Sequence, residues 1–401
     1  MMTPRQIELV KSTVPVLREH GVALTTHFYK RMLEGNPELR NVFNTAHQAK
    51  GEQQKALAMA VLAYAENIEN PAVLMPAVKH IATKHCTIDI RPEQYAIVGR
   101  HLLASIREVL GEAASDELVD AWAAAYAQLA EILIGVESKI YAGHTARENA
   151  WSGWRPFKVI ERREETPDTV SFELVPADGG GIPSYLPGQF ISVRTFLKDR
   201  GIVQPRQYTL SRASGLKPSL RITVKRIDNG MDPEGAMSSH LHRYVYDGSI
   251  LDVSAPTGDF VLEDKDTPVI LIGAGSGMTP MAAMLGHLAQ NTPQRPVEFI
   301  GCAPDMQHVI LGMDIRENMA KLSQAKAHLF LSKSTETSQC PVVKNERLTQ
   351  KALQELHLNT AADVYLCGPV TFMDKVKASL LALGFASSQI HTEIFGTGMM
   401  A

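Results

Sequence analysis

Cysteine is scarce in this 401-residue chain, and the pattern of the few cysteines present is informative. Cys86, Cys302, Cys340 and Cys367 are scattered and form no C-x-x-C pair. This spacing does not support a disulfide framework. It fits a reducing cytosol better than an oxidising compartment, so we expect a cytoplasmic protein.

Long apolar runs and basic stripes are also missing. No stretch of about 18 apolar residues occurs, so no membrane span is expected. The N-terminal stretch MMTPRQIELVKSTVPVL has no apolar signal core, and it predicts a helix capped by Thr3 with Pro4 at the first position. The net charge is −3, and no basic stripe interleaved with aromatics is present. A nucleic-acid partner is therefore not expected.

The length exceeds what one hydrophobic core serves and predicts two or three domains. Residues 1–147 are predicted to be helical almost throughout. Breaks are expected at EGNPE (34–38), IENPA (68–72), IDIRPEQ (88–94) and LGEAASDE (110–117). Such a series of helices predicts an all-α domain rather than a symmetric four-helix bundle.

Two regions with different residue patterns follow the helical one. Residues 151–262 contain short β-branched runs such as TVSFELV, QFISVRTF, QYTLSR, LRITVKRI and SILDVSAP, which predict a small antiparallel β-barrel. Residues 263–401 alternate strands with helices, the strands being TPVILIGAG, PVEFIGCA, KAHLFLSK, ADVYLCGP and IHTEIFG. This alternation predicts an α/β domain with a parallel sheet.

The stretch VILIGAGSGMTPMAAML predicts a buried strand, a glycine turn and a helix opened by Thr279 and Pro280. Gly273, Gly275 and Gly277 would allow the backbone to approach a pyrophosphate at the helix N-terminus. Tight turns use glycine for geometry alone, and Pro280 closes the pattern where G-x-G-x-x-G has glycine. The glycines by themselves are therefore weak evidence for a nucleotide site.

Further motifs lie on both sides of this turn. RQYTLS (206–211) follows PGQF (187–190) and precedes GAMSSHLH (235–242), and CGP (367–369) precedes EIFG (393–396). Alternating Arg and Tyr on a strand share one face and can contact one flat ligand. An exposed cation beside an ordinary β aromatic, or a core phenylalanine at position 395, would each be the simpler interpretation in isolation.

Taken together, five motifs in this order resemble the ferredoxin reductase-type flavin module over residues 150–401. The resemblance implies FAD in the barrel and NADH or NADPH on the α/β domain, with hydride entering the flavin and single electrons leaving it. It assigns these residues to cofactor binding: Phe190, Arg206, Gln207, Tyr208, Thr209, Gly235, Ser238, Gly275, Ser276, Gly277, Met278, Thr279, Pro280, Ile394, Phe395, Gly396 and Thr397.

The helical half contains two histidines five positions apart, in AVKHIATKHC (77–86). On a helix they point about 140° apart, so they cannot ligate one ion together. His85 continues an apolar face with Val78 and Ile81, whereas His80 lies on the polar side and is expected to be solvated. Alone, His85 would be a core histidine more often than a metal ligand.

Four other polar or aromatic residues change that balance. Gln53 is the first residue of an otherwise apolar helix face, and Tyr29 lies on an earlier helix. The Gln53 amide and the Tyr29 hydroxyl would both be costly to bury without hydrogen-bond partners. Tyr95 lies on an apolar stripe of a later helix. Glu137 borders the apolar face of the last helix, where a carboxylate invites pairing with the second nitrogen of His85.

This combination resembles a globin, and the whole chain resembles a flavohaemoglobin from end to end. Tyr29, Phe43, Gln53, Lys84, His85, Tyr95 and Glu137 match the pattern of that family. The resemblance implies that His85 binds the iron of haem b, with Phe43 and Lys84 in the cofactor pocket. It implies catalytic roles for Tyr29, Gln53, Tyr95 and Glu137. The absence of C-x-x-C-H excludes the usual covalent haem attachment.

The activity implied is nitric oxide dioxygenation, in which nitric oxide and oxygen become nitrate at the expense of NAD(P)H. A general haem and flavin reductase, or an oxygen sensor or carrier, are the alternatives. GCAPD (301–305) carries no arginine for a 2′-phosphate, which favours NADH weakly. The partners expected are small molecules, with no obligate protein partner and a monomeric state.

A few positions depart from the family pattern. Phe190 stands where tyrosine is usual after P-G-Q, Thr209 replaces a more common serine, and Met237 replaces a small aliphatic residue. Thr397 follows Gly396 in place of proline. None of these changes removes a group that electron transfer requires.

Overall fold

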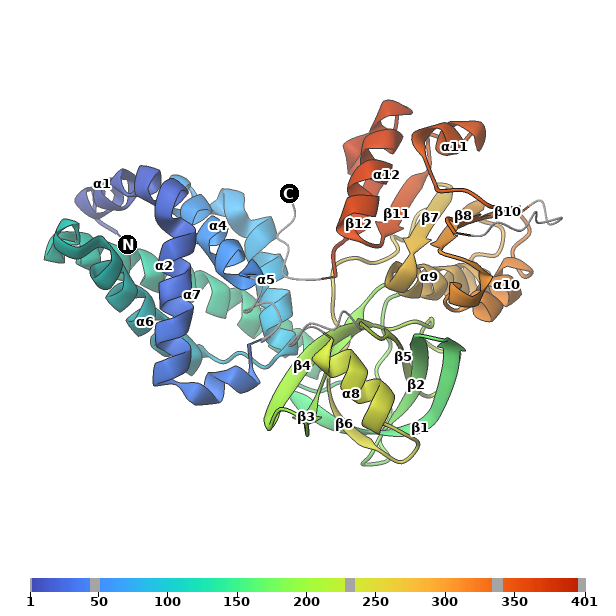
Figure 1. Cartoon of the computed structure of the whole chain (residues 1–401), viewed down its shortest axis with the longest axis horizontal. Helices are drawn as coiled ribbons and strands as arrows, with labels where there is room; N and C mark the ends of the chain where they lie inside the picture. Colours follow the sequence, from blue (N-terminus) through green and yellow to red (C-terminus); the bar gives the residue numbers. More distant parts are fainter. Residues whose placement is uncertain (1, 44–50, 228–234, 334–341, 396–401) are drawn as a thin grey trace.

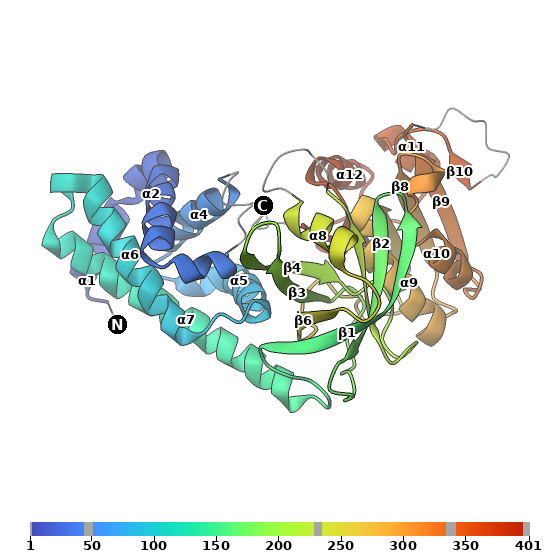
Figure 2. The same ribbon diagram turned by 60° about the horizontal axis from the view of Figure 1, so that its bottom comes forward.

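The chain forms a helical domain, an antiparallel barrel and a parallel α/β sheet in that order (Figure 1). The computed structural model describes residues 2–43, 51–227, 235–333 and 342–395. The helical domain lies to one side, and the barrel and the parallel sheet lie together on the other. Two views agree that the helical domain meets the barrel near α5 and β4 (Figures 1 and 2).

Six α-helices and three short 3-10 turns make up the described part of the helical domain. They are α1 (Pro4–Ser12), α2 (Val14–Gly35), η1 (Pro37–Asn41), α4 (Glu52–Glu66), η2 (Pro71–Leu74), α5 (Met75–Thr87), α6 (Pro92–Leu110), η3 (Gly111–Ala113) and α7 (Asp116–Ala146). Thr3 caps α1 through a capping box with Gln6, as the sequence predicts. The four predicted breaks each fall between two helices.

The core of the helical domain is apolar and contiguous. It joins Phe28 and Met32 of α2, Tyr64 of α4, Leu102 of α6 and Trp122 of α7. Helix α7 alone is long and apolar enough to cross a membrane by length and composition within the described residues. Because α7 contributes residues to this core and also buries Glu137, it has the features of an interior helix.

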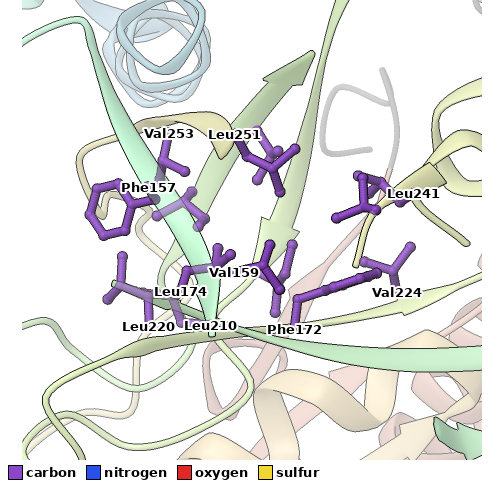
Figure 3. Close-up of a cluster of buried hydrophobic side chains, with 14 of the residues drawn as sticks. Phe157, Val159, Phe172, Leu174, Leu210, Leu220, Val224, Leu241, Leu251 and Val253 are labelled. Carbon is purple, nitrogen blue, oxygen red and sulfur yellow. The ribbon is translucent and has the colours of Figure 1, made fainter. Parts of the chain in front are cut away.

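The barrel is a six-stranded antiparallel sheet with strand order β4-β3-β6-β1-β2-β5. Its strands are β1 (Trp154–Thr166), β2 (Thr169–Pro176), β3 (Phe190–Leu197), β4 (Ile202–Thr209), β5 (Leu220–Lys225) and β6 (Ile250–Ser254), with helix α8 (Ala236–Tyr244) after β5. A bridge between Leu210 and Ile222 closes the barrel beyond β4. Side chains such as Phe157, Phe172 and Leu241 fill the interior (Figure 3).

The sequence patterns located five of these strands and missed β1. In β1 only Phe157 and Val159 are fully buried, and the charged run from Glu161 to Glu165 hides its strand character. Strand β4 also begins at Ile202, earlier than QYTLSR indicated. Pro205 within β4 obscures it, because proline cannot donate a ladder hydrogen bond.

The second sheet is parallel, with order β10-β9-β8-β7-β11-β12. Its strands are β7 (Val269–Ala274), β8 (Val297–Ala303), β9 (Ala325–Leu331), β10 (Val343–Lys344), β11 (Asp363–Cys367) and β12 (Ile390–Glu393), and its helices are α9 (Met278–Asn291), α10 (Gly312–Met319), α11 (Gln350–Glu355) and α12 (Val370–Ala382). Leu271 packs towards α9 and Ile272 towards α12, so both faces are covered.

The strand order reverses between β7 and β11. From β7 the chain adds β8 and β9 on one side, and then returns to place β11 on the other. In open α/β sheets, ligands bind at the carboxyl ends of the strands at such a switch point. Gly275–Gly277, after β7, and Gly368, after β11, lie at this position.

Candidate functional site

One cavity of about 810 Å³ connects the three parts of the molecule. Helices α2, α4, α5 and α6 line one end, and β4, the start of α8 and the last described residues line the other. Seventeen residues expected from the sequence to form the site lie along its wall: Tyr29, Phe43, Gln53, Lys84, His85, Tyr95, Phe190, Arg206, Gln207, Tyr208, Thr209, Gly235, Ser238, Ser276, Thr279, Ile394 and Phe395.

His85 lies on the wall formed by α5, α6 and α7, with its Nδ1 held in a fixed orientation. Glu137 Oε1 lies 2.7 Å from His85 Nδ1, and the Tyr95 hydroxyl donates to the same oxygen at 2.5 Å. Glu137 is only 2% exposed. Because Nδ1 is bonded to this carboxylate, Nε2 is the ring nitrogen available to an iron ion.

The tyrosine in this network is held as a neutral donor. Burial, followed by the hydrogen bond and the charge of Glu137, raises the pKa of Tyr95 well above its ordinary value. Its backbone carbonyl accepts a further hydrogen bond of 2.6 Å from Tyr126. The Glu137 carboxyl group therefore has two polar partners, the Tyr95 hydroxyl and Nδ1 of His85.

The second histidine of this helix, His80, was expected to be solvated, and this expectation is wrong. His80 is partly buried and lines the same cavity as His85, from a different face of α5. Burial and the neighbouring charge of Lys84 lower its pKa. The cause lies outside the helix, since Asp259 of the barrel side approaches this face and forms an ion pair with Lys79.

The opposite wall of this end is apolar with one isolated hydroxyl. Tyr29 is 7% exposed, and burial alone raises its pKa. Its ring packs edge-on against Phe28 and Phe43, with centroid distances of 5.0 and 5.8 Å. Within the described residues the Tyr29 hydroxyl has no hydrogen-bond partner, although Gln53 also lines this wall. A ligand entering here would meet a donor that is otherwise unused.

At the other end of the cavity, Arg206 and Tyr208 project from β4. Burial lowers the pKa of Arg206 to about 10. Its Nη1 donates to Gln204 Oε1 at 3.2 Å and to the carbonyl of Pro205 at 2.6 Å, and no carboxylate in the described part of the chain pairs with it. A half-buried guanidinium without a counter-ion suits an anionic ligand such as a phosphate.

The turn into α8 provides backbone donors beside this arginine. Gly235 has a positive φ of 77°, and a Cβ at this position would lie 2.0 Å from the carbonyl oxygen of Ile227. Glycine is therefore required here. The Ser238 hydroxyl accepts from the Ile227 amide and donates to the Gly235 carbonyl, which holds the turn in place.

The glycines after β7 have a structural role that the sequence pattern did not separate from ligand binding. A Cβ on Gly277 would lie 2.2 Å from the carbonyl oxygen of Cys367, so this glycine allows the turn to pack against CGP. Gly275 has a positive φ of 56° and open space at its Cβ. Of this turn, Ser276 and Thr279 reach the cavity.

Several predicted residues lie outside the cavity wall. Glu137 is one layer behind His85, and Met278 and Pro280 are buried in the sheet core. Gly275 and Gly277 do not line the cavity. Gly396 and Thr397 lie outside the described residues.

Sequence reasoning missed a partly buried acidic residue of the cavity. Glu393, at the end of β12, faces Lys84 of α5 across the cavity, and burial raises the pKa of Glu393 to about 7. Burial in turn lowers the pKa of Lys84, while Glu393 raises it. The motif EIFG contained this glutamate, yet only the fold shows that α5 and β12 approach each other.

Comparison with known families divides the chain in the same way. Residues 26–133 match the globin family, residues 156–262 the FAD-binding domain of oxidoreductases, and residues 271–378 the NAD-binding domain of oxidoreductases.

Whole-length relatives carry all three parts. The flavohemoprotein of Bordetella parapertussis is 48% identical over the full length of both chains, and that of Chromobacterium violaceum is 47% identical over 99% of each. A crystal structure of flavohemoglobin from Malassezia yamatoensis with bound FAD and heme has a TM-score of 0.86 and 30% identity, covering 98% of this chain and 100% of that one. The FAD/NAD-binding domain of a nitric oxide dioxygenase from Vibrio cholerae has a TM-score of 0.55 and 34% identity, covering 60% and 98%.

The fold and these matches define a globin joined to an oxidoreductase with FAD- and NAD-binding domains. The chain belongs to the flavohaemoglobin family, and its cofactors are haem, FAD and a nicotinamide nucleotide. The cavity fits these groups. It offers a haem His85 and the Tyr29 hydroxyl, and it offers a flavin phosphate Arg206, which has no carboxylate partner among the described residues.

Proposed function

We propose that this oxidoreductase is a nitric oxide dioxygenase, which converts nitric oxide and oxygen to nitrate with electrons from NAD(P)H. The observation that carries the proposal is the single cavity shared by His85 at one end and Arg206 at the other. A carrier of oxygen has no need of a continuous electron supply. The similar reductase half from Vibrio cholerae, which belongs to a nitric oxide dioxygenase, supports the same activity.

At the haem end the chain's residues do two separate things. We assign His85 Nε2 as the iron ligand, with Glu137 and Tyr95 fixing the ring and making it a better electron donor through Nδ1. Tyr29 donates its free hydroxyl towards a ligand on the opposite side, assisted by Gln53, while Phe43 and the apolar wall exclude water. The haem supplies oxygen activation when bound, and FAD supplies the conversion of a hydride into single electrons.

At the flavin end, Arg206 neutralises a phosphate, and Tyr208 and Thr209 of the same strand hold the flavin ring. The turn from Gly235 to Ser238 offers backbone donors to the pyrophosphate. Phe395, which is 45% exposed, provides a ring over which an aromatic ligand can stack. We assign the haem, FAD and NAD(P) domains to residues 1–147, 151–262 and 263–401.

The remaining expectations belong to the same proposal. The nucleotide is NADH or NADPH, and the segment GCAPD (301–305) at the end of β8 favours NADH weakly, because it carries no arginine for a 2′-phosphate. A cytoplasmic location is supported by the three free thiols of the described residues, Cys86, Cys302 and Cys367, and we expect the enzyme to be a monomer.

The test is nitric oxide consumption at an electrode by the protein loaded with haem and FAD. Oxygen and NADH are each omitted in turn, and NADPH is substituted once. Rapid decay that requires both oxygen and nucleotide, with nitrate as the product, is the expected result. If NADH is oxidised while nitric oxide persists, the dioxygenase assignment fails, and reduction of another acceptor becomes the function.

A further inference from the structure

Strand β4 has one edge along which no other strand of the described residues pairs over its first half. It pairs with β3 on one side, and the barrel closes only beyond its end, at Leu210. The 3-10 turn Pro37–Asn41 of the helical domain lies along the free part of this edge, and the amide of Val203 donates to Asn41 Oδ1 at 2.9 Å. The strand that carries the flavin-end residues is therefore bonded directly to the haem domain.

Gln204, the next residue of β4, extends this contact with its side chain. The side chain is fully buried, at 0% exposure. Its Nε2 donates to the carbonyl of Arg40 at 2.6 Å and to the carbonyl of Phe43 at 3.2 Å. Arg40 lies within the 3-10 turn and Phe43 lies just after it, so one amide is hydrogen-bonded both to the turn and to the segment that follows it.

The other end of the same amide contacts Arg206, which we assign to the flavin phosphate. Gln204 Oε1 accepts from Arg206 Nη1 at 3.2 Å. Since residues 204 and 206 of a strand point to the same face, this contact follows directly from the strand geometry. A single side chain therefore touches both the arginine assigned to the flavin phosphate and the backbone of Phe43, whose ring packs against Tyr29 at 5.8 Å.

We propose that Gln204 is a positioning residue. It fixes β4, the strand assigned to the flavin, against the distal wall of the haem pocket, which is the wall that carries Tyr29 and Phe43. It sets the separation and orientation of the two cofactors, and thereby the rate at which electrons pass from FAD to haem. It also holds Phe43 against Tyr29. The proposal depends on the haem and FAD of the family and is independent of nitric oxide as the substrate.

Two substitutions test the donor and acceptor functions of the Gln204 amide. Gln204→Met keeps the volume but removes both hydrogen-bonding functions. Gln204→Glu keeps the oxygen that Arg206 approaches, but it cannot donate to the two carbonyls and places a charge beside them. If the hydrogen bonds from Gln204 to the helical domain set the rate of electron transfer, both variants should slow it, because neither can donate to the two carbonyls. Asn41→Ala is the matched control, because it opens the neighbouring contact with Val203 and leaves Gln204 in place.

The measurement is stopped-flow reduction of the haem- and FAD-loaded protein by NADH under carbon monoxide without oxygen. Reduction of FAD by NADH should change by less than about twofold, whereas electron transfer from FAD to haem should slow by about tenfold or more in both Gln204 variants, because small displacements of reacting groups have large rate effects. Asn41→Ala should stay close to the unsubstituted protein. Haem and FAD content is measured by absorbance for each variant.

Two readouts besides turnover complete the test. Hydrogen exchange of the amides in residues 37–43 should accelerate in both Gln204 variants, and the carbon monoxide stretching frequency of the ferrous haem should shift as Phe43 and Tyr29 move. A normal electron transfer rate with Gln204→Glu, or an equal slowing by Asn41→Ala, would overturn the proposal. Nitric oxide is absent from these experiments, so their outcome is separate from that of the dioxygenase test.

Discussion

The two walls of the haem end of the cavity differ in polarity and in hydrogen bonding. The proximal wall is charged and fully bonded, because Glu137 accepts from Tyr95 and pairs with His85 while it is almost completely buried. The distal wall is apolar, and its one buried hydroxyl, on Tyr29, has no partner within the described residues. A saturated network holds a permanent group in place, whereas an unsatisfied donor is available to a transient one.

The largest effect is expected from removing the proximal ligand. His85→Ala should abolish stoichiometric haem binding, since the iron loses its only protein ligand in the proposed site. Absorbance of the purified protein after haem addition measures this directly. His80→Ala is the matched control, because His80 lines the same cavity from the same helix and should leave haem binding intact. Haem retained in the His85 variant with an unchanged spectrum would refute the assignment.

The next largest effect is expected on the distal wall. Tyr29→Phe removes only the unpartnered hydroxyl and keeps the ring packing with Phe28 and Phe43. Loss of one hydrogen bond to a charged or strongly polarised ligand should lower the rate of nitric oxide consumption by about 10- to 100-fold. Haem content and NADH-dependent flavin reduction should not change. An unaltered rate would mean that this donor does not act on the ligand.

The proximal charge should act more moderately, through the reduction potential. Glu137→Gln keeps the shape but removes the negative charge beside His85, which makes the histidine a weaker electron donor. The haem potential should rise by on the order of 50–100 mV, equivalent to about 1–2 kcal/mol for one electron. Spectroelectrochemical titration measures it. Tyr95→Phe, which keeps the charge, should shift the potential less, and an equal shift would assign the effect to hydrogen bonding instead.

The smallest effect concerns the stability of the fold. It involves His144, which lies two turns beyond Glu137 on α7. Burial, with a smaller contribution from Arg147, lowers the pKa of His144 from 6.5 to about 4. Between these values an unfolded chain binds a proton that the folded chain does not, so stability falls as pH falls from about 7 to about 4. The loss should be about 3 kcal/mol over this window, with about 2 kcal/mol of it between pH 7 and pH 5.

Denaturant unfolding followed by haem absorbance at pH 7 and pH 5 measures this pH dependence. His144→Leu should reduce it, because leucine binds no proton in either state. The same variant should leave nitric oxide consumption at pH 7 unchanged. Equal pH dependence in both proteins would show that other groups cause the acid loss.

Much of the fold followed from local patterns, because helices and strands are encoded in short periods. The four helix breaks, the cap at Thr3 and five strands of the parallel sheet were predicted where the structure has them, whereas the two-residue strand β10 was missed. Strand β1 was missed, since its second half is charged and exposed on the barrel surface. An alternating pattern is visible only where one face of a strand is buried.

Within the site, residues on one helix face or one strand were easier to predict than residues that meet across domains. The pairing of Glu137 with His85 was expected and is present, whereas their action on iron stays a prediction. Glu393 and Gln204 were missed, because their importance comes from α5 and the 3-10 turn approaching them in space. His80 was misjudged for the same reason, since Asp259 comes from a distant segment.

The edge of β4 that faces the helical domain has a consequence for the assembly of the molecule. A strand edge with free amides and carbonyls is a template on which another chain can add a strand. In this protein the turn Pro37–Asn41 covers that edge, so the haem domain also shields the barrel from self-association. Light scattering of the reductase half prepared without residues 1–147 should therefore show more aggregation than that of the intact chain.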